Sequence, residues 1–163
     1  MEKFINNIQA KGMKFNIIEF LKRVGKAKGF GIQSPWAFRF VTEVVADRWR
    51  YYAYEDIEKK FQKRYEQKYQ KLLFRIRNFV YPDKLLVMPL TSITAENLTD
   101  LLCQVGRKGA IVVEGIRESK ESLCKWEKLK EREEIGITFD MYSFAVCFFD
   151  RNIYKQHYKL NFL

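Results

Sequence analysis

Two hydrophobic periodicities divide the chain near Pro82. Before that residue, apolar side chains recur at spacings of three and four positions, which is typical of amphipathic helices. After it, short apolar runs that are typical of strands alternate with helical stretches. The order is helices, then β-α-β-α-β-β-β, which predicts a three-layer α/β fold whose sheet has an antiparallel edge. We expect one domain over residues 1–163, with a helical region over 1–82 and a sheet region over 83–163.

Helices are predicted throughout the N-terminal region. A short amphipathic helix is expected over residues 17–24, where a basic, glycine-flanked loop ends it. A second helix starts at Ser34 and Pro35, because serine caps free N–H groups and proline is tolerated at the first helical position. A long helical pattern over residues 55–80 predicts either one helix or two helices that break near Tyr69.

Strands and two intervening helices are predicted after Pro82. The expected strands are residues 85–88, 110–113, 135–141, 144–149 and 158–162. The continuous apolar run at 110–113 is typical of a strand covered on both faces. Thr94 and Ser119 are expected to begin the two helices, and Gly106 to end the first of them. The close turn before residue 144 predicts an antiparallel hairpin.

The turn after the first predicted strand contains no glycine. In doubly wound α/β proteins this turn holds a phosphate-bearing or nucleoside cofactor, and glycines normally let the backbone approach it. Residues 89–94 have none, and the next glycine is Gly106 at the far end of the helix. Thr91, Ser92 and Thr94 could offer hydroxyls to a cofactor here, and Ser92 and Thr94 are the candidates for cofactor contact in this turn. The alternative is that their hydroxyls serve only as turn and cap groups.

The charge of the chain is strongly positive. Its 163 residues include 30 Lys and Arg against 20 Asp and Glu, a formal net charge of +10. Such an excess indicates either contact with nucleic acid or an anionic surface, or a solvated surface without a ligand. The candidates for nucleic-acid binding are Arg48, Arg50, Lys63, Arg64, Lys71 and Arg75. Acidic residues lie among them at helical spacings, so ion pairing along the helix is the alternative interpretation.

The other reactive residues point to no catalytic site. Cys103, Cys124 and Cys147 form no CxxC pattern and lie in apolar-periodic segments, which predicts buried free thiols in a reducing compartment. With His157 as the only histidine, a histidine-based metal site or a Ser/His hydrolase is not expected. No apolar run reaches the roughly 18 residues of a membrane span, and residues 1–12 lack a secretory apolar core. A cytoplasmic location is expected.

Three sequence segments carry a family resemblance. They are Gly29-Phe30-Gly31-Ile32-Gln33-Ser34-Pro35, Tyr51-Tyr52-Ala53-Tyr54-Glu55-Asp56-Ile57-Glu58 and Lys155-Gln156-His157-Tyr158. In this order the chain resembles class I S-adenosylmethionine-dependent methyltransferases of the kind common in Bacteroidetes. There, an HGIHSP entry precedes the first core helix and a KQHF ending closes the last strand. The resemblance implies a reduced Rossmann-like methyltransferase sheet with antiparallel C-terminal strands behind an N-terminal helical region.

The departures from the family concern its cofactor site. The family's first strand ends in an acidic, glycine-containing loop, and an acid at the end of the second strand holds the ribose hydroxyls. Residues 82–90 supply neither at the first position, and residues 85–109 match the family's fourth strand and helix equally well. Where the family has an acidic pair, this chain has Glu114-Gly115. Glu114 is thus either a weak cofactor-binding candidate or an ordinary strand-end carboxylate.

The resemblance and its departures together predict a non-catalytic, methyltransferase-like protein without the cofactor-binding half, acting as a protein-interaction module. Neither a catalytic residue, a cofactor nor a metal is expected. Missing strands expose a sheet edge, so we expect either a homodimer that closes the edge or cover by the helix over residues 55–80. One alternative is an S-adenosylmethionine-dependent methyltransferase with an atypical loop. The other is a nucleic-acid-binding protein, although the aromatics at 51–54 also match the family pattern, which favours packing.

Overall fold

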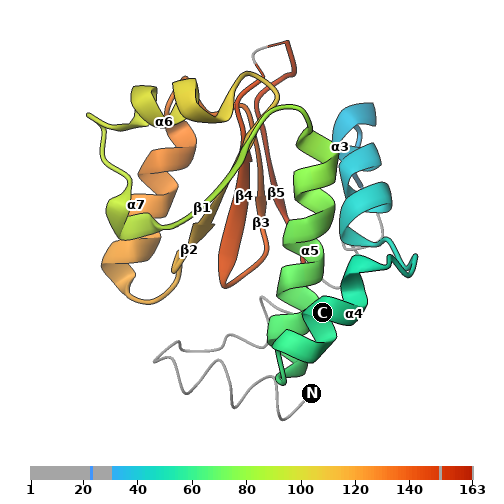
Figure 1. The fold of residues 1–163 in the computed structure, drawn as a ribbon. Helices are drawn as coiled ribbons and strands as arrows, with labels where there is room; N and C mark the ends of the chain where they lie inside the picture. Colours follow the sequence, from blue (N-terminus) through green and yellow to red (C-terminus); the bar gives the residue numbers. More distant parts are fainter. Residues whose placement is uncertain (1–22, 24–30, 151, 163) are drawn as a thin grey trace.

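The protein is a mixed α/β structure in which one sheet separates two layers of helices (Figure 1). The computed structural model describes Arg23, residues 31–150 and residues 152–162. The helix expected over 17–24, apart from Arg23, and the first two residues of the family-like entry segment lie outside these described residues.

The sheet has five strands in the order β1-β2-β4-β3-β5. Their bounds are β1 Leu85–Pro89, β2 Ala110–Glu114, β3 Ile137–Asp140, β4 Phe144–Phe148 and β5 Gln156–Lys159. The strand–helix order expected after Pro82 is confirmed. The expected antiparallel edge is wrong, because β4 alone runs against its neighbours and lies in the centre of the sheet, while β5 at the edge is parallel to β3. The hairpin partner β4 is apolar on both faces, which suits a central position.

The helices form one layer on each face of the sheet, as Figure 1 shows. One layer contains α3 (Pro35–Phe40), the π-helix η2 (Val41–Val45) and α5 (Arg64–Val80), with α4 (Ala53–Lys60) joining η2 to α5. The other contains the short 3-10 helix η3 (Leu90–Ser92), α6 (Leu98–Val105) and α7 (Lys120–Glu131). The described helices include none that is long and apolar enough to cross a membrane.

The helix ends follow their capping residues. Ser34 Oγ accepts a hydrogen bond from Ala37 N at 3.3 Å, with Pro35 in the first turn, so the predicted start of α3 is confirmed. Ser119 caps α7 in the same way. Gly106 ends α6 with φ of +81°, a left-handed conformation that favours glycine, so this predicted stop is also confirmed.

The long helical pattern is broken near Phe61 rather than near Tyr69. Phe61 adopts an extended conformation after α4, and its carbonyl accepts a hydrogen bond from Gln67 Nε2 at 2.7 Å. The following helix, α5, packs on a face of the sheet rather than over an edge. Among the described residues β1 pairs with β2 alone. Lys84 precedes this short strand and Pro89 is its last residue, and such residues are common where proteins discourage pairing at an edge.

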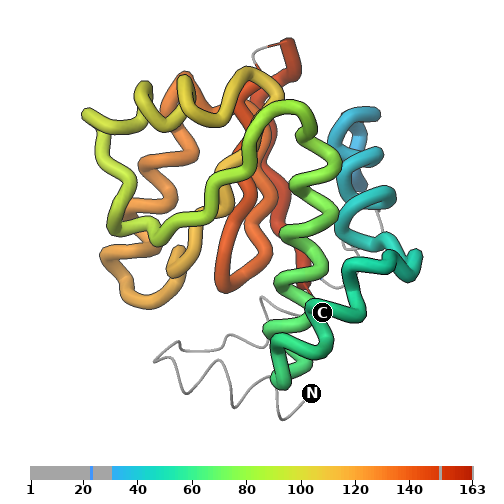
Figure 2. Tube along the Cα trace, in the orientation of Figure 1, coloured from blue at the N-terminus to red at the C-terminus, as the bar shows by residue number. Residues whose placement is uncertain are grey.

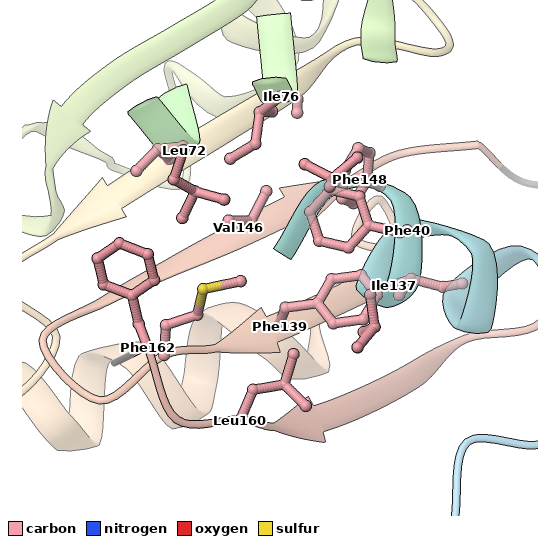
Figure 3. Close-up of a cluster of buried hydrophobic side chains, with 14 of the residues drawn as sticks. Phe40, Leu72, Ile76, Ile137, Phe139, Val146, Phe148, Leu160 and Phe162 are labelled. Carbon is pink, nitrogen blue, oxygen red and sulfur yellow. The ribbon is translucent and has the colours of Figure 1, made fainter. Parts of the chain in front are cut away.

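Each face of the sheet has its own apolar cluster. Under α3 and α5, Phe40 packs against Phe139 and Phe148 with ring centroids 4.5 and 5.0 Å apart, and Leu72 and Ile76 close the cluster from above (Figure 3). The opposite cluster joins α6 and α7 to the sheet around side chains such as Trp126. These two clusters position the ends of the strands relative to the helices.

Only one of the three cysteines is buried. Cys147 lies on β4, and its burial raises the pKa of its thiol. Cys103 and Cys124 are exposed free thiols, so the prediction that all three are buried is wrong for these two. They lie on the outer sides of α6 and α7, where apolar neighbours in the sequence face the other way.

Candidate functional site

Four strand ends meet at one edge of the sheet. β1, β2, β3 and β5 are parallel to one another, so their carboxyl ends lie at the same edge. Pro89 is in register with Glu114, and Asp140 is in register with Lys159. Ligands of open α/β sheets bind outside this edge, so it is where a cofactor site is expected.

Apolar side chains fill the turn that follows β1. Leu90 and Ile93 are only 2% and 3% exposed, and both belong to the apolar cluster under α6 and α7. A cofactor in the turn would occupy the volume next to the backbone, where glycines normally leave space. The residues present therefore do not fit a nucleoside cofactor held in this turn.

The hydroxyl of Thr94 is used within the turn itself. Thr94 Oγ1 accepts a hydrogen bond from Asn97 N at 3.2 Å, and Thr94 N donates to Asn97 Oδ1 at 2.9 Å. Asn97 Nδ2 also donates to the carbonyl of Ser92 at 2.8 Å, while the Ser92 side chain is exposed. α6 therefore begins after Asn97, later than expected, and Thr94 has the turn role given as the alternative.

An open groove of about 380 Å³ lies beside Thr94. Its lining includes three cationic side chains from α7 and its end, namely Lys125, Lys128 and Arg132. S-adenosylmethionine carries a positive sulfonium, and cationic side chains in the lining of the groove disfavour such a charge. The groove therefore gives no support to a methyl-donor site.

Glu114, the third weak cofactor-binding candidate, anchors α5 to the end of β2. Tyr69 Oη donates to Glu114 Oε1 at 2.6 Å, and the Tyr69 ring contacts Phe144 with centroids 4.9 Å apart. Burial, together with the bond to the carboxylate, raises the pKa of Tyr69, so its phenol stays protonated and donating. Glu114 is thus engaged as a strand-end carboxylate.

Replacing Tyr69 with phenylalanine should lower the free energy of unfolding by about 1 to 2 kcal/mol, because it removes a hydrogen bond to a carboxylate while keeping the ring. Urea denaturation at pH 7 measures the change. The matched control is Tyr81→Phe, since that phenol is 81% exposed and its loss should leave stability unchanged. Equal stability of Tyr69→Phe and the wild type would contradict this anchoring role.

A second cluster at this edge, made of buried charged side chains, was not predicted from the sequence. Asp140, at the end of β3, is 2% exposed and lies between two arginines. Arg117 Nη2 is 2.6 Å from Asp140 Oδ2, and Arg23 Nη1 is 2.8 Å from Asp140 Oδ1. Burial alone would raise the pKa of Asp140, but the hydrogen bonds and charges of Arg117 and then Arg23 outweigh it and hold that pKa below its usual range.

The Asp140 cluster fixes the turn between β3 and β4. Tyr142 N donates to Asp140 Oδ1 at 2.9 Å, and Arg117 Nη1 donates to the Tyr142 carbonyl at 2.9 Å. Tyr142 has φ of +76°, which side-chain-bearing residues rarely adopt, and both guanidinium groups lie within 5.4 Å of its ring centroid. The carboxylate is therefore engaged in holding a strained turn. The sequence feature that could have indicated this cluster is an acidic residue between an alternating strand pattern and a close turn.

Two of the six candidate basic residues have structural roles. Arg75 Nε donates to the Val44 carbonyl at 2.5 Å, and Arg75 Nη1 donates to Tyr54 Oη at 2.8 Å, which joins α5 to η2 and α4. Lys71 forms an ion pair with Glu58, which joins α5 to α4. The Lys71 contact is an ion pair between two helices rather than along one helix, and the contacts of Arg75 are with uncharged oxygens.

The other four basic candidates are exposed. Lys63 lies 3.5 Å from Glu66 in an ion pair between exposed side chains, an interaction that contributes little in water. Arg64 begins α5, while Arg48 and Arg50 lie in the segment between η2 and α4. Basic groups at these positions are accessible to an anionic partner.

Comparison of the chain with protein-family models, with curated proteins and with solved structures gives no match. Within the described part of the chain, no three His, Cys, Asp or Glu side chains are grouped so that they could hold a metal ion. Function is therefore inferred from the geometry of the strand ends and of the exposed surface.

Proposed function

We propose that the protein is a non-catalytic relative of class I S-adenosylmethionine-dependent methyltransferases that acts as a binding module. The observation that supports this function is the filled turn after β1. Leu90 and Ile93 belong to the apolar core there, where the family opens a glycine-containing loop for its cofactor. A nucleoside can enter this turn only if core side chains leave it.

The polar groups around the turn support the same proposal. The Thr94 hydroxyl accepts the N–H of Asn97, and the Glu114 carboxylate accepts the phenol of Tyr69. Two of the three weak cofactor candidates, Thr94 and Glu114, are thus bonded within the protein, while the Ser92 side chain is exposed. The β1-α6-β2 unit and the β3–β4 hairpin are consistent with a reduced Rossmann-like sheet in which an antiparallel strand follows parallel ones.

Isothermal titration calorimetry of the full chain with S-adenosylmethionine tests this function. We expect no binding heat, and no rise in melting temperature when the ligand is added at millimolar concentration. A ligand present at about 100 times its Kd would stabilise the protein by about 2.7 kcal/mol, which a thermal melt detects easily. S-adenosylhomocysteine serves as a second ligand, since it shares the nucleoside and lacks the sulfonium charge.

Micromolar binding of either ligand would overturn the proposal. If binding were also weakened by Ser92→Ala or Thr94→Ala, and methyl transfer to an acceptor were detected, the protein would be a methyltransferase with an atypical cofactor loop. Thr99→Ala is the matched control for these two variants, because Thr99 is exposed on α6, outside the turn.

A further inference from the structure

The segment between η2 and α4 displays two large aromatic side chains to solvent. This segment stands out from the helical layer at the right of Figure 2. Trp49 is 80% exposed and Tyr52 is 97% exposed. The family pattern at residues 51–54 favours packing of its aromatic side chains. This prediction is confirmed for Tyr54, which is buried, and is wrong for Tyr52, which is exposed. Two large aromatic side chains three positions apart in the sequence are thus accessible to a partner.

Asp47 organises this segment. Its carboxylate accepts hydrogen bonds from Trp49 N at 2.9 Å and from Tyr51 Oη at 2.9 Å. The Tyr51 ring in turn packs edge-on against Tyr54, with centroids 5.3 Å apart. Tyr51 and Asp47 therefore fix the backbone, while the rings of Trp49 and Tyr52 remain accessible to solvent. A surface that is already ordered loses less entropy on binding.

Positive charge is concentrated in the same part of the chain. Residues 48–75 contain nine Lys and Arg against four Asp and Glu, a net charge of +5 out of the +10 of the whole chain. The pKa of Glu58 is lowered, first by the hydrogen bond from Lys71 and its charge, and also by the positive charge of Arg50. The exposed lysines that end α4 extend this charge toward α5, while Glu55 and Asp56 in the first turn of α4 limit it.

We propose that residues 48–52 form a binding site for single-stranded nucleic acid, in which Trp49 and Tyr52 stack on bases and Arg48 and Arg50 contact phosphates. The site deepens the proposed function, on which it rests, by naming the partner of the binding module. Aromatic rings stack on unpaired bases of any sequence, and nearby cations neutralise the backbone. A duplex keeps its bases stacked inside, so it offers nothing to these rings.

Fluorescence anisotropy of a labelled oligothymidylate of about 15 nucleotides, titrated with the full chain, tests the site. We expect the single strand to bind more tightly than a duplex of equal length. Trp49→Ala and Tyr52→Ala should each weaken binding at least about fivefold, which is the lower end of what a stacked base contributes. With two phosphate contacts, the plot of log K against log salt concentration should have a slope of about −1.4, and Arg48→Gln with Arg50→Gln should abolish that slope.

Tyr81→Ala is the matched control for the aromatic variants. Tyr81 is as exposed as Trp49 and lies outside residues 48–52, directly after the last residue of α5. We expect its binding to equal that of the wild type. Asp47→Ala keeps both rings and tests their positioning, and it should also weaken single-strand binding.

Three results would overturn the site. The first is no anisotropy change at about 50 mM salt. The second is equal affinity for the single strand and for the duplex, and the third is single-strand affinity that stays at the wild-type value in both Trp49→Ala and Tyr52→Ala. Preserved binding to heparin in the aromatic variants, together with unchanged oligonucleotide affinity, would identify simple charge attraction. Each of these results leaves the calorimetry with S-adenosylmethionine unaffected, so failure of this site and failure of the proposed function are distinguishable.

Discussion

Replacing Asp140 with alanine should lower the free energy of unfolding by about 3 to 5 kcal/mol, because it leaves the buried guanidinium of Arg23 and the largely buried one of Arg117 without their shared carboxylate. Both side chains of the pair formed with Arg23 are almost fully buried, at 2% and 3% exposure. The turn at Tyr142 also loses the bond that holds its strained backbone. Urea denaturation at pH 7, followed by circular dichroism, measures the change.

The matched control is Asp150→Ala. Asp150 pairs with Arg107 at 3.4 Å, and that arginine is largely exposed, so the variant should lose little stability. Similar losses in Asp140→Ala and Asp150→Ala would contradict the special role of the buried cluster. If Asp140→Ala fails to fold, Asp140→Asn provides the same comparison, because it keeps the shape and removes the charge.

The contribution of Asp140 should depend on pH in a defined direction. Its folded-state pKa is lowered, so the stabilisation is fully present above the unfolded pKa of about 3.9 and is lost as the pH falls through the folded value. The difference in unfolding free energy between the wild type and Asp140→Asn should therefore be constant near neutrality and narrow below about pH 4. A gap that widens in acid would show that the carboxyl is not held ionised by the arginines.

Apolar periodicity predicted the elements of this fold because each one buries a separate stripe of side chains. The strand at residues 110–113 is a clear case, since its continuous apolar run corresponds to β2, which is buried on both faces. The cap at Ser34 and the helix start at Ser119 were predictable for the same local reason, whereas Thr94, expected to begin α6, bonds to Asn97 within the turn before that helix. Interactions within a few residues can be read from the chain because they need no knowledge of which elements meet.

Contacts between distant elements were not predictable in this way. The central place of β4 depends on pairing with β2 as well as with its hairpin partner, and an apolar run is compatible with either a central or an edge position. The Asp140 cluster joins residues 23, 117 and 140, which no local pattern connects. The exposure of Tyr52 next to buried Tyr54 likewise depends on where α5 packs, since both residues are tyrosines in one motif.

Truncating Leu90 to alanine should lower the free energy of unfolding by about 2 to 4 kcal/mol, because it opens a cavity in the apolar cluster under α6 and α7. Leu90 lies at the start of the turn that would hold a cofactor in the family, yet it is as buried as the side chains of the strands. Urea denaturation of Leu90→Ala measures the loss, and exposed Thr91→Ala in the same turn is the control. In a turn that binds a ligand, the side chains are exposed to the ligand, so truncating one of them changes the free energy of unfolding little. If Leu90→Ala were as stable as the wild type, the turn would not be filled by the apolar core, and this edge of the sheet would again be a candidate cofactor site.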